Sequence, residues 1–417
     1  MRVGIIGGGA SGMMAAYACA SNGNDVVIFE KNSKLGRKLF ITGKGRCNVT
    51  NDTTPDEVIK NTVSNPKFLY TAVNAFTPEN VKSFFEKEGV ALKTERGNRV
   101  FPESDKSSSI ISALEKALKS VGVVVKLNTE VVKLSVKKEG FLIETHFESH
   151  VFDRVIVATG GFSYKATGST GDGYKFAESC GHSVTDIKAA LVPIIVRQVC
   201  GKSFSKYPSL EGLSLKNVVL SAKIGKKVVY EELGEMLFTD KGISGPLVLS
   251  ASSVINRKVE QCEISLDLKP ALSEEVLDAR IRRDFEKNIN KRFKNALDEL
   301  LPKKLIPFII KLSDIPEERV VRDVTKEERR RLVTLLKNLV FNKIELDDID
   351  YGIITAGGVS TKEINPKNME SKLIKGLYFV GEVLDLDAFT GGFNLQIAFS
   401  TGYLAGNSIK GDTENDF

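Results

Sequence analysis

The sequence predicts an α/β fold with three parts: a parallel-sheet domain, a β-barrel-like domain inserted into it, and a helical subdomain nested within that insertion. Three observations lead to this prediction. An apolar strand runs into a glycine turn near the N-terminus, residues 192–272 alternate short strands with turns, and residues 273–343 show helical periodicity punctuated by prolines. The predicted boundaries are 1–191 and 355–417 for the parallel-sheet domain, 192–272 and 344–354 for the β domain, and 273–343 for the helical subdomain.

The first element is a nucleotide-binding turn. Arg2–Ile6 is expected to form a buried strand, Gly7–Gly12 has the spacing GxGxxG, and an alanine-rich helix follows at Met13–Ala20. In such a turn the first glycine allows the tight bend, the second lets the backbone approach a pyrophosphate, and the third lets the helix pack on the sheet. Free N–H groups at the helix start favour phosphate. The segment therefore predicts a Rossmann-like domain.

The second strand, Asp25–Phe29, ends in an acidic residue, Glu30. A carboxylate in this place accepts hydrogen bonds from a ribose diol. It also disfavours a ribose 2′-phosphate, because two negative charges would meet. We therefore expect FAD or NAD rather than NADP at this turn.

A basic, glycine-rich segment follows at Gly36–Asn51, with the sequence GRKLFITGKGRCNVTN. It lacks both helical and strand periodicity, so we expect an irregular loop. Its cations are candidate partners for a diphosphate, because Lys and Arg make charge-assisted hydrogen bonds to such oxygens. The alternative is a solvated basic loop.

Two later regions also predict a strand that is followed by glycine residues. Arg154–Ala158 predicts a strand that continues into Thr159-Gly160-Gly161, and the sequence GSTGDG then precedes a helix at Tyr174–Cys180. Near the C-terminus, Gly376–Glu382 predicts another buried strand, and AFTGGFNLQ at Ala388–Gln396 opens an apolar helix. Exposed amides at that helix start would stabilise negative charge.

Together these motifs resemble the two-dinucleotide-binding flavoprotein superfamily. More narrowly, GKGRCNVTN, GSTGDGYKFAESCGH, GEMLFTDKGISGP and GGFNLQIAFSTGYLAG are similar to a bacterial family of NAD(P)/FAD-dependent oxidoreductases, with aminoacetone-oxidase-like and bile-acid 3-dehydro Δ4,6-reductase-like members. The resemblance runs from Arg2 to about Ile409. It implies non-covalent FAD in the domain of residues 1–191 and 355–417, and NAD(P)H as a transient electron donor.

The resemblance also implies which residues hold FAD. The pyrophosphate would lie against Gly7, Gly9, Ala10, Ser11 and Gly12, and the adenosine ribose against Glu30, beside Lys31. The channel would be lined by Lys38, Thr42, Gly43, Arg46, Cys47 and Asn48. The adenosine side would be formed by Val131, Ala158, Thr159 and Gly160, the ribityl side by Gly381, Glu382 and Asp385, and the isoalloxazine would be flanked by Gly392, Phe393, Asn394 and Leu395.

The middle of the chain is predicted to be the insertion. Its strands are expected at Ile194–Val199, Asn217–Ile224, Lys227–Glu232, Glu263–Asp267 and Ile344–Ile354, with a loop at Leu233–Pro246. Its helices are expected at Leu247–Asn256, Glu274–Lys287, Arg292–Glu299, Lys303–Leu312 and Lys326–Asn338.

Composition and charge limit the partners. The chain has 59 basic and 53 acidic residues, and residues 280–343 alone have 18 basic against 10 acidic, a local net charge of +8. No apolar run approaches the roughly 18–20 residues that span a bilayer, so no membrane partner is expected. The five cysteines form no CxxC pair, which favours reduced thiols and a cytoplasmic protein. The three histidines lack metal-ligand spacing, so no metal site is expected.

These observations predict an FAD-dependent oxidoreductase. It would move a hydride between flavin N5 and a small or medium apolar organic substrate, for example by reducing an enone with NAD(P)H as donor. Two alternatives stay open: an oxidase of a small amine, and a flavoenzyme that binds RNA through residues 280–343. RNA is the weaker one, because the aromatic residues of that segment stand at apolar helix positions rather than at stacking positions. The sequence singles out no catalytic residue and no oligomeric state.

Overall fold

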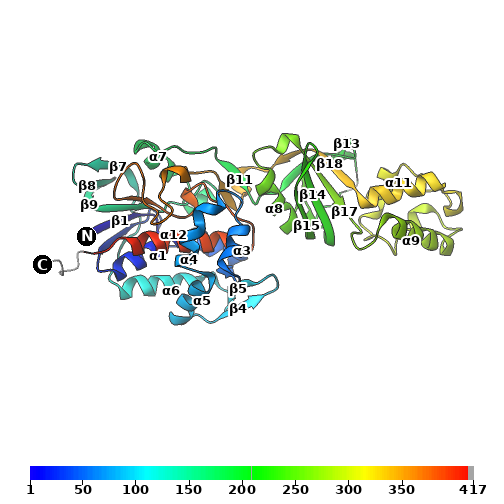
Figure 1. Cartoon of the computed structure of the whole chain (residues 1–417). Helices are drawn as coiled ribbons and strands as arrows, with labels where there is room; N and C mark the ends of the chain where they lie inside the picture. The colour runs from blue at the N-terminus through cyan, green and yellow to red at the C-terminus, as the bar shows by residue number, and fades with distance from the viewer. Residues whose placement is uncertain (208, 412–417) are drawn as a thin grey trace. The chain divides into compact units, whose positions relative to one another are not determined.

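Figure 1 shows the computed structural model, which describes residues 1–207 and 209–411. The chain divides into two compact units, Met1–Ala190 with Ile349–Phe417, and Leu191–Asp348. Residues 412–417, which the sequence assigns to the FAD-binding domain, lie outside the described residues, as does residue 208 of the predicted β domain. The finer boundaries at residues 272 and 344 stay a prediction.

The first unit is built on a five-stranded parallel sheet. Its order is β20 (Leu377–Phe379), β10 (Arg154–Val157), β1 (Arg2–Ile6), β2 (Asp25–Phe29) and β6 (Val124–Lys126). Central strand β1 pairs Val3 with Val26 on one side and with Arg154 on the other. The central strands are almost wholly apolar and buried, as expected for a sheet covered on both faces. The predicted Rossmann-like sheet is confirmed.

The first and last helices of the chain, α1 (Ala10–Ser21) and α12 (Phe393–Ser408), pack directly against each other (Figure 1). Two glycines of α12 make this possible. A Cβ atom on Gly402 would lie 2.3 Å from the Ser11 carbonyl oxygen, and one on Gly406 would lie 2.2 Å from the Ala15 carbonyl oxygen. The C-terminal helix is therefore seated on the helix that follows the glycine turn.

Smaller elements complete the first unit. The remaining helices are α2 (Arg37–Gly45), α3 (Pro55–Lys60), α4 (Tyr70–Ala75), α5 (Pro78–Lys87), α6 (Ser107–Ser120) and α7 (Asp172–Ser179). Three small antiparallel sheets consist of β7 (Val131–Lys137), β8 (Gly140–Thr145) and β9 (Ser149–Phe152); of β3 (Thr50–Asn51), β5 (Arg99–Pro102) and β4 (Leu92–Glu95); and of β11 (Lys188–Ala190) and β19 (Ile354–Ala356).

Helix α2 corrects the expectation of an irregular loop at Gly36–Asn51. The segment begins as a helix, and Thr42, Gly43 and Lys44 then leave helical dihedral angles. Lys44 has a φ of 59° and Cys47 a φ of 61°, both in the left-handed region. Non-glycine residues stay there only when their surroundings hold them, and such positions are common at ligand sites.

The second unit contains a closed antiparallel barrel. Around the ring, the strands are β12 (Ile194–Val199), β16 (Gly242–Ser244), β15 (Lys227–Phe238), β14 (Ser214–Ile224), β17 (Cys262–Asp267) and β18 (Leu339–Leu346). Strand β18 pairs back with β12 and closes the ring, while β13 (Lys202–Ser203) adds to β12 alone. The expected hairpin is confirmed, with Ile224 opposite Lys227. The predicted β-barrel-like insertion is therefore present, and closure removes the free edges of the sheet.

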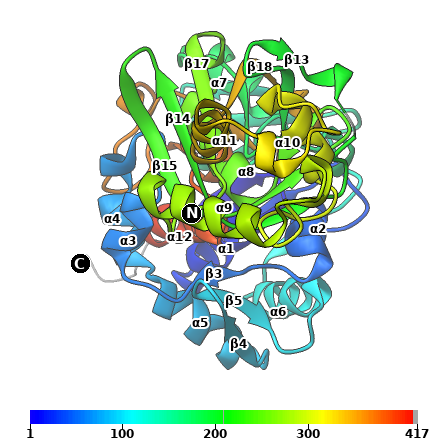
Figure 2. The same cartoon turned by 90° about the vertical axis from the view of Figure 1, so that its right-hand side faces the viewer.

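Four helices accompany the barrel strands. Helix α8 (Pro246–Ile255) follows β16, and α9 (Glu274–Lys287), α10 (Ile306–Ser313) and α11 (Lys326–Lys337) lie between β17 and β18 in the chain (Figure 2). Helix α11 begins with a capping box, in which Thr325 and Glu328 each accept a hydrogen bond from the other's backbone N–H. Helices are therefore present in residues 273–343 as predicted, and their separation as a subdomain stays a prediction.

Three expectations for the insertion are wrong. The predicted loop at Leu233–Pro246 is instead strand as far as Phe238, followed by β16. The predicted helix at Arg292–Glu299 is a short 3-10 turn, because Phe293 N–H donates to the Arg319 carbonyl at 2.8 Å rather than within a helix. The predicted strand at Ile344–Ile354 ends at Leu346, and a separate strand begins at Ile354.

Gly406→Ala is expected to destabilise the first unit. The added methyl group would meet the Ala15 carbonyl oxygen, so α1 and α12 would have to move apart. Such overpacking costs roughly 1–3 kcal/mol in the free energy of unfolding, measured by urea denaturation. Asn407→Ala, a partly exposed position on the same helix, is the control and should change this value by less than about 0.5 kcal/mol. Equal stability of the two variants would contradict the close helix contact.

Candidate dinucleotide-binding site

The glycine turn lies at the carboxyl end of β1, where ligands bind in open α/β sheets. Gly7 has a φ of 108°, and a Cβ atom there would lie 2.5 Å from the Ala158 carbonyl oxygen. A Cβ atom on Gly12 would lie 2.0 Å from the Gly7 carbonyl oxygen. At Gly9, in contrast, an added Cβ would have no atom within 4 Å among the described residues, its own chain neighbours aside. Backbone therefore closes the turn on two sides and leaves it open at Gly9, at the start of α1.

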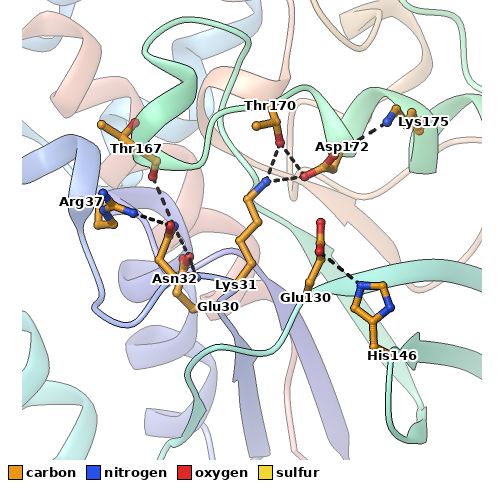
Figure 3. Close-up of polar contacts among 10 residues, drawn as sticks. All are labelled: Glu30, Lys31, Asn32, Arg37, Glu130, His146, Thr167, Thr170, Asp172 and Lys175. Carbon is orange, nitrogen blue, oxygen red and sulfur yellow. Dashed lines mark hydrogen bonds and ion pairs between the residues drawn. The ribbon is translucent and has the colours of Figure 1, made fainter.

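Glu30 holds this turn from the end of β2. Its carboxylate accepts a hydrogen bond from Gly8 N–H at 2.8 Å. It also accepts from Asn32, through the backbone N–H at 2.9 Å and the side-chain amide at 2.6 Å (Figure 3). Glu30 is 8% exposed. A carboxylate has about four acceptor positions, so these three donors leave capacity for one more.

Lys31 ties a distant loop to the same place. Its ammonium donates to the Asp172 carboxylate at 2.6 Å and to the Thr170 hydroxyl at 2.5 Å, and Thr170 in turn donates to Asp172 at 2.7 Å. The Asn32 amide also donates to the Thr167 carbonyl at 3.2 Å (Figure 3). The GSTGDG segment is therefore fastened beside Glu30.

The remaining residues expected on the adenosine side lie near Glu30 and the glycine turn. Thr129 N–H donates to the Glu30 carbonyl at 2.9 Å, which brings the buried Val131 alongside. Ala158 N–H donates to the Ile6 carbonyl at 2.8 Å and places Thr159 and Gly160 just beyond the sheet. The Thr159 Oγ1 atom is buried without a hydrogen-bond partner among the described residues.

Lys38 and Glu382 meet as an ion pair. The Lys38 ammonium lies 2.7 Å from the Glu382 carboxylate and 2.8 Å from the Ser163 hydroxyl, and both charged side chains are half-buried. Glu382 also accepts from Thr355 N–H at 2.9 Å. The pair joins α2 to the segment that follows β20, although 344 residues separate its members.

The segment after β20 reaches the start of α1. Gly381 packs so closely against Ser11 that an added Cβ atom would lie 2.5 Å from its hydroxyl oxygen. Asp385, a buried residue of this segment, accepts from the Asn65 amide through its carbonyl at 2.8 Å and its carboxylate at 3.1 Å. Gly381, Glu382 and Asp385 thus stand next to the glycine turn in space.

The left-handed turn after α2 buries two further expected residues. Cys47 N–H donates to the Thr42 carbonyl at 3.0 Å, and the Cys47 side chain is fully buried. Burial raises the pKa of the Cys47 thiol to about 12, so this cysteine is a protonated thiol at neutral pH. The Asn48 Oδ1 atom is buried without a hydrogen-bond partner among the described residues, and Gly43 packs against the Asn48 backbone.

Two expected residues use their side chains elsewhere. The Arg46 guanidinium binds Glu95 and Asp105 and lies 4.1 Å above the Phe101 ring. The Asn394 side chain is hydrogen-bonded to both backbone groups of Ala388, at 2.8 and 2.9 Å. Each therefore holds a loop in place rather than presenting a free polar group.

The start of α12 lies against strand β3. Gly392 caps the helix and packs on Thr50, whose hydroxyl donates to Gln396 at 2.5 Å. Phe393 is buried and Leu395 is partly exposed.

Sequence reasoning missed several polar residues of this region. Asn32, Ser163 and Thr355 carry no local signal that points to this site. Each has a partner far away in the chain: Thr167 for Asn32, Lys38 for Ser163 and Phe162 for Thr355. Asp172 and Tyr174 did carry a local signal, since Asp172 belongs to the GSTGDG motif and Tyr174 directly follows it. Within the described residues, no group of three or more His, Cys, Asp or Glu side chains is arranged to hold a metal ion. No described helix is long and apolar enough to cross a membrane.

The parallel sheet, glycine turn and acidic β2 end define a Rossmann-type protein. A family model described as "HI0933-like protein Rossmann domain" matches residues 1–408, and the chain belongs to this family. It is 32% identical to a 3-dehydro-bile acid delta(4,6)-reductase of Clostridium scindens, over 98% of both chains. It is also 32% identical to a ribosomal RNA dihydrouridine synthase of Haemophilus influenzae, over 97% of this chain and 98% of that one. The family resemblance of the sequence is confirmed.

Solved structures agree on the fold. A 3-ketosteroid-delta4-(5alpha)-dehydrogenase from Rhodococcus jostii RHA1 superposes with a TM-score of 0.50 at 13% identity, covering 97% of this chain and 96% of that chain. The open conformation of a flavocytochrome c3 fumarate reductase gives a TM-score of 0.51 at 17% identity, covering 97% and 77%. At these identities the likeness shows the fold alone.

Asp172→Asn is expected to destabilise the first unit at neutral pH but not in acid. Burial opposes the charge of Asp172, but hydrogen bonds from Lys31 and Thr170 outweigh it, so the pKa of this carboxyl lies below its ordinary value. Such a group stabilises the fold above the unfolded-state pKa of about 3.9 and loses that contribution as the pH falls through the folded-state pKa. We expect a loss of about 1 kcal/mol in the free energy of unfolding at pH 7. The loss should approach zero once the pH lies below the folded-state pKa.

The control for this measurement is Asp186→Asn, an exposed aspartate of the same unit. It should change the free energy of unfolding little at either pH. If Asp172→Asn behaved in the same way as this control at pH 7, the Lys31–Asp172 pair would not be what holds the GSTGDG segment.

Proposed function

We propose that the reaction of this enzyme, an FAD-dependent oxidoreductase, is the reduction of a carbon–carbon double bond conjugated to a carbonyl group, with NAD(P)H as electron donor. The strongest support is that two full-length relatives, each 32% identical, are named for reactions of this kind. One name describes a 3-oxo bile acid with double bonds at positions 4 and 6. The other describes dihydrouridine, which is uridine with its ring double bond saturated beside a carbonyl.

The first unit fits FAD. Gly9 leaves open space at the start of α1, where phosphates bind. Glu30 keeps acceptor capacity for a ribose hydroxyl after its three internal hydrogen bonds. The buried oxygens of Asn48 and Thr159 have no partner among the described residues, as expected of groups that a ligand satisfies. When bound, FAD supplies the hydride chemistry, and the chain supplies binding and orientation.

The proposed binding residues are those that the sequence indicates, with two changes of role. Arg46 and Asn394 act by positioning loops, because their side chains are engaged within the protein. FAD is held without a covalent bond, since none of the three histidines is among the proposed binding residues. We also propose a cytoplasmic location, because all five cysteines are free thiols and NAD(P)H is available there.

The first candidate substrate is a small or medium apolar enone, as in the bile-acid relative. The second is uridine within ribosomal RNA, which the equally similar Haemophilus relative favours. Fewer cations of residues 280–343 are free to contact RNA than the sequence indicates, because several are paired with carboxylates. Arg329 is paired with Asp278 at 2.6 Å, Arg280 with Asp284 at 2.9 Å, and Arg319 binds Glu328.

Anaerobic reoxidation decides between these candidates. We expect NADH or NADPH to bleach the bound flavin, and a 4,6-dien-3-one steroid to restore its absorbance with formation of the saturated product. Purified ribosomal RNA is the parallel acceptor, with dihydrouridine measured in nuclease digests. Reoxidation by RNA alone would make the second candidate the function. A flavin that reacts only with O₂ would refute the proposed reaction in both forms.

Paired arginine variants test the RNA candidate from the protein side. Arg330→Gln with Arg331→Gln removes two exposed cations, while Arg329 keeps its bond to Asp278. If RNA docks here, the slope of log affinity against log salt should flatten by up to about two units. An unchanged slope with unchanged stability would leave the enone as the substrate.

Glu30→Ala is expected to weaken FAD binding. The loss of a hydrogen bond to a charged group costs about 1.5–3 kcal/mol, which is a roughly 10- to 150-fold higher dissociation constant. The structure adds a second effect: Gly8 and Asn32 lose their acceptor, so the apoprotein should also melt at a lower temperature. Flavin fluorescence quenching measures the affinity, and Glu139→Ala, at an exposed turn, is the control. An unchanged dissociation constant would mean that Glu30 serves only the protein itself.

A further inference from the structure

The hydroxyl group of Tyr174 is a buried polar group with no evident use in the protein. Tyr174 belongs to the first turn of α7, directly after the GSTGDG motif, and is 7% exposed. Its hydroxyl oxygen makes no hydrogen bond within the described chain. Leaving such a group unsatisfied costs roughly 1–3 kcal/mol, so its presence calls for an explanation.

The position of α7 places this hydroxyl among the proposed FAD-binding residues. Gly173 packs against Thr159 and Val383, at distances of 2.1 and 2.7 Å from an added Cβ atom. The start of α7 therefore lies between the segments that follow β10 and β20. Burial, and then the charges of Glu382 and Asp385, raise the pKa of Tyr174, so its hydroxyl stays protonated at neutral pH.

The polar groups of Glu382, Asp385 and Tyr174 suit one part of a dinucleotide better than the others. The Asp385 carboxylate would repel a phosphate, whereas both it and the Glu382 carboxylate can accept hydrogen bonds from alcohols. A protonated phenol beside them is a donor. A chain of alcohol groups suits both, since each hydroxyl can donate to a carboxylate and accept from the phenol.

We propose that the Tyr174 hydroxyl binds the ribityl chain of FAD by donating a hydrogen bond to one of its hydroxyl oxygens. The inference rests on the proposed function, because it assumes that FAD is the cofactor. It explains why the phenol has no hydrogen-bond partner among the residues that the structure describes. It also explains the glycine at position 173, because a side chain there would displace α7 from Thr159.

Tyr174→Phe tests this with two opposite expectations. FAD should bind roughly 2- to 10-fold more weakly, the effect of one lost neutral hydrogen bond. The flavin-free protein should melt at the same temperature or higher, because an unsatisfied buried hydroxyl has been removed. ADP, which shares the adenosine half of FAD and lacks the ribityl chain, should compete for the site equally well in both proteins.

Tyr230→Phe is the matched control. Tyr230 is a similarly buried tyrosine of strand β15, and its hydroxyl donates a hydrogen bond to Glu232 at 2.6 Å. This variant should lose stability and keep its FAD affinity, the reverse of the pattern for Tyr174→Phe.

Each remaining outcome overturns a specific claim. Unchanged FAD affinity in Tyr174→Phe would mean that a resident water or nothing satisfies the phenol, and the inference fails while the proposed function stands. Equal weakening of FAD and ADP would place Tyr174 at the adenosine half and refute the ribityl assignment. If the unsubstituted protein does not bind FAD, the proposed function fails, and this inference with it.

Discussion

The structure depends on how closely backbone segments approach one another at the end of β1. Gly7 lies against the Ala158 carbonyl, Gly12 against the Gly7 carbonyl, and Gly402 against the Ser11 carbonyl. A side chain at any of these places would separate two segments that must touch. These contacts hold β1, the segment after β10 and α12 close to the same glycine turn. Gly9 alone is spared this crowding, and the open space that remains there is what a phosphate needs.

Two ion pairs hold loops that lie outside the sheet. Lys31 holds the GSTGDG segment, and Lys38 holds the segment after β20. Both pairs are half-buried, where an ion pair is screened less than at the surface. Lys38 is also one of the cations that the sequence offers to a diphosphate. Because these ammonium groups are already paired with carboxylates, we expect backbone N–H groups and the α1 dipole to be the main partners of the proposed pyrophosphate.

The parts of the fold that could be predicted are those with a local physical cause. A glycine turn between an apolar strand and a helix has few alternatives, and β12 and α9 begin and end at the expected residues. Gly234 shows the opposite case: it suggests a loop, yet β15 runs through it, because Leu247 packs where a side chain would stand. At the site, Glu30 and its strand were predictable, whereas its bond to Gly8 and the role of Asn32 were not. The same holds for Tyr174, whose missing partner is visible only once burial is known.

The two candidate substrates make different demands on the second unit. An apolar enone requires only a pocket that excludes water, and stability of the helices is then the main role of their charges. RNA requires cations that are free to meet phosphates. Arg329 is bidentate to Asp278, and Arg319 binds Glu328, which itself caps α11. A cation that is part of a helix cap or an interhelical pair stabilises the free protein and must lose that bond to contact RNA. Because several of these cations are paired, the net charge of +8 is weaker evidence for RNA binding than the sequence alone suggests. The enone is the candidate substrate that needs no free cations in this unit.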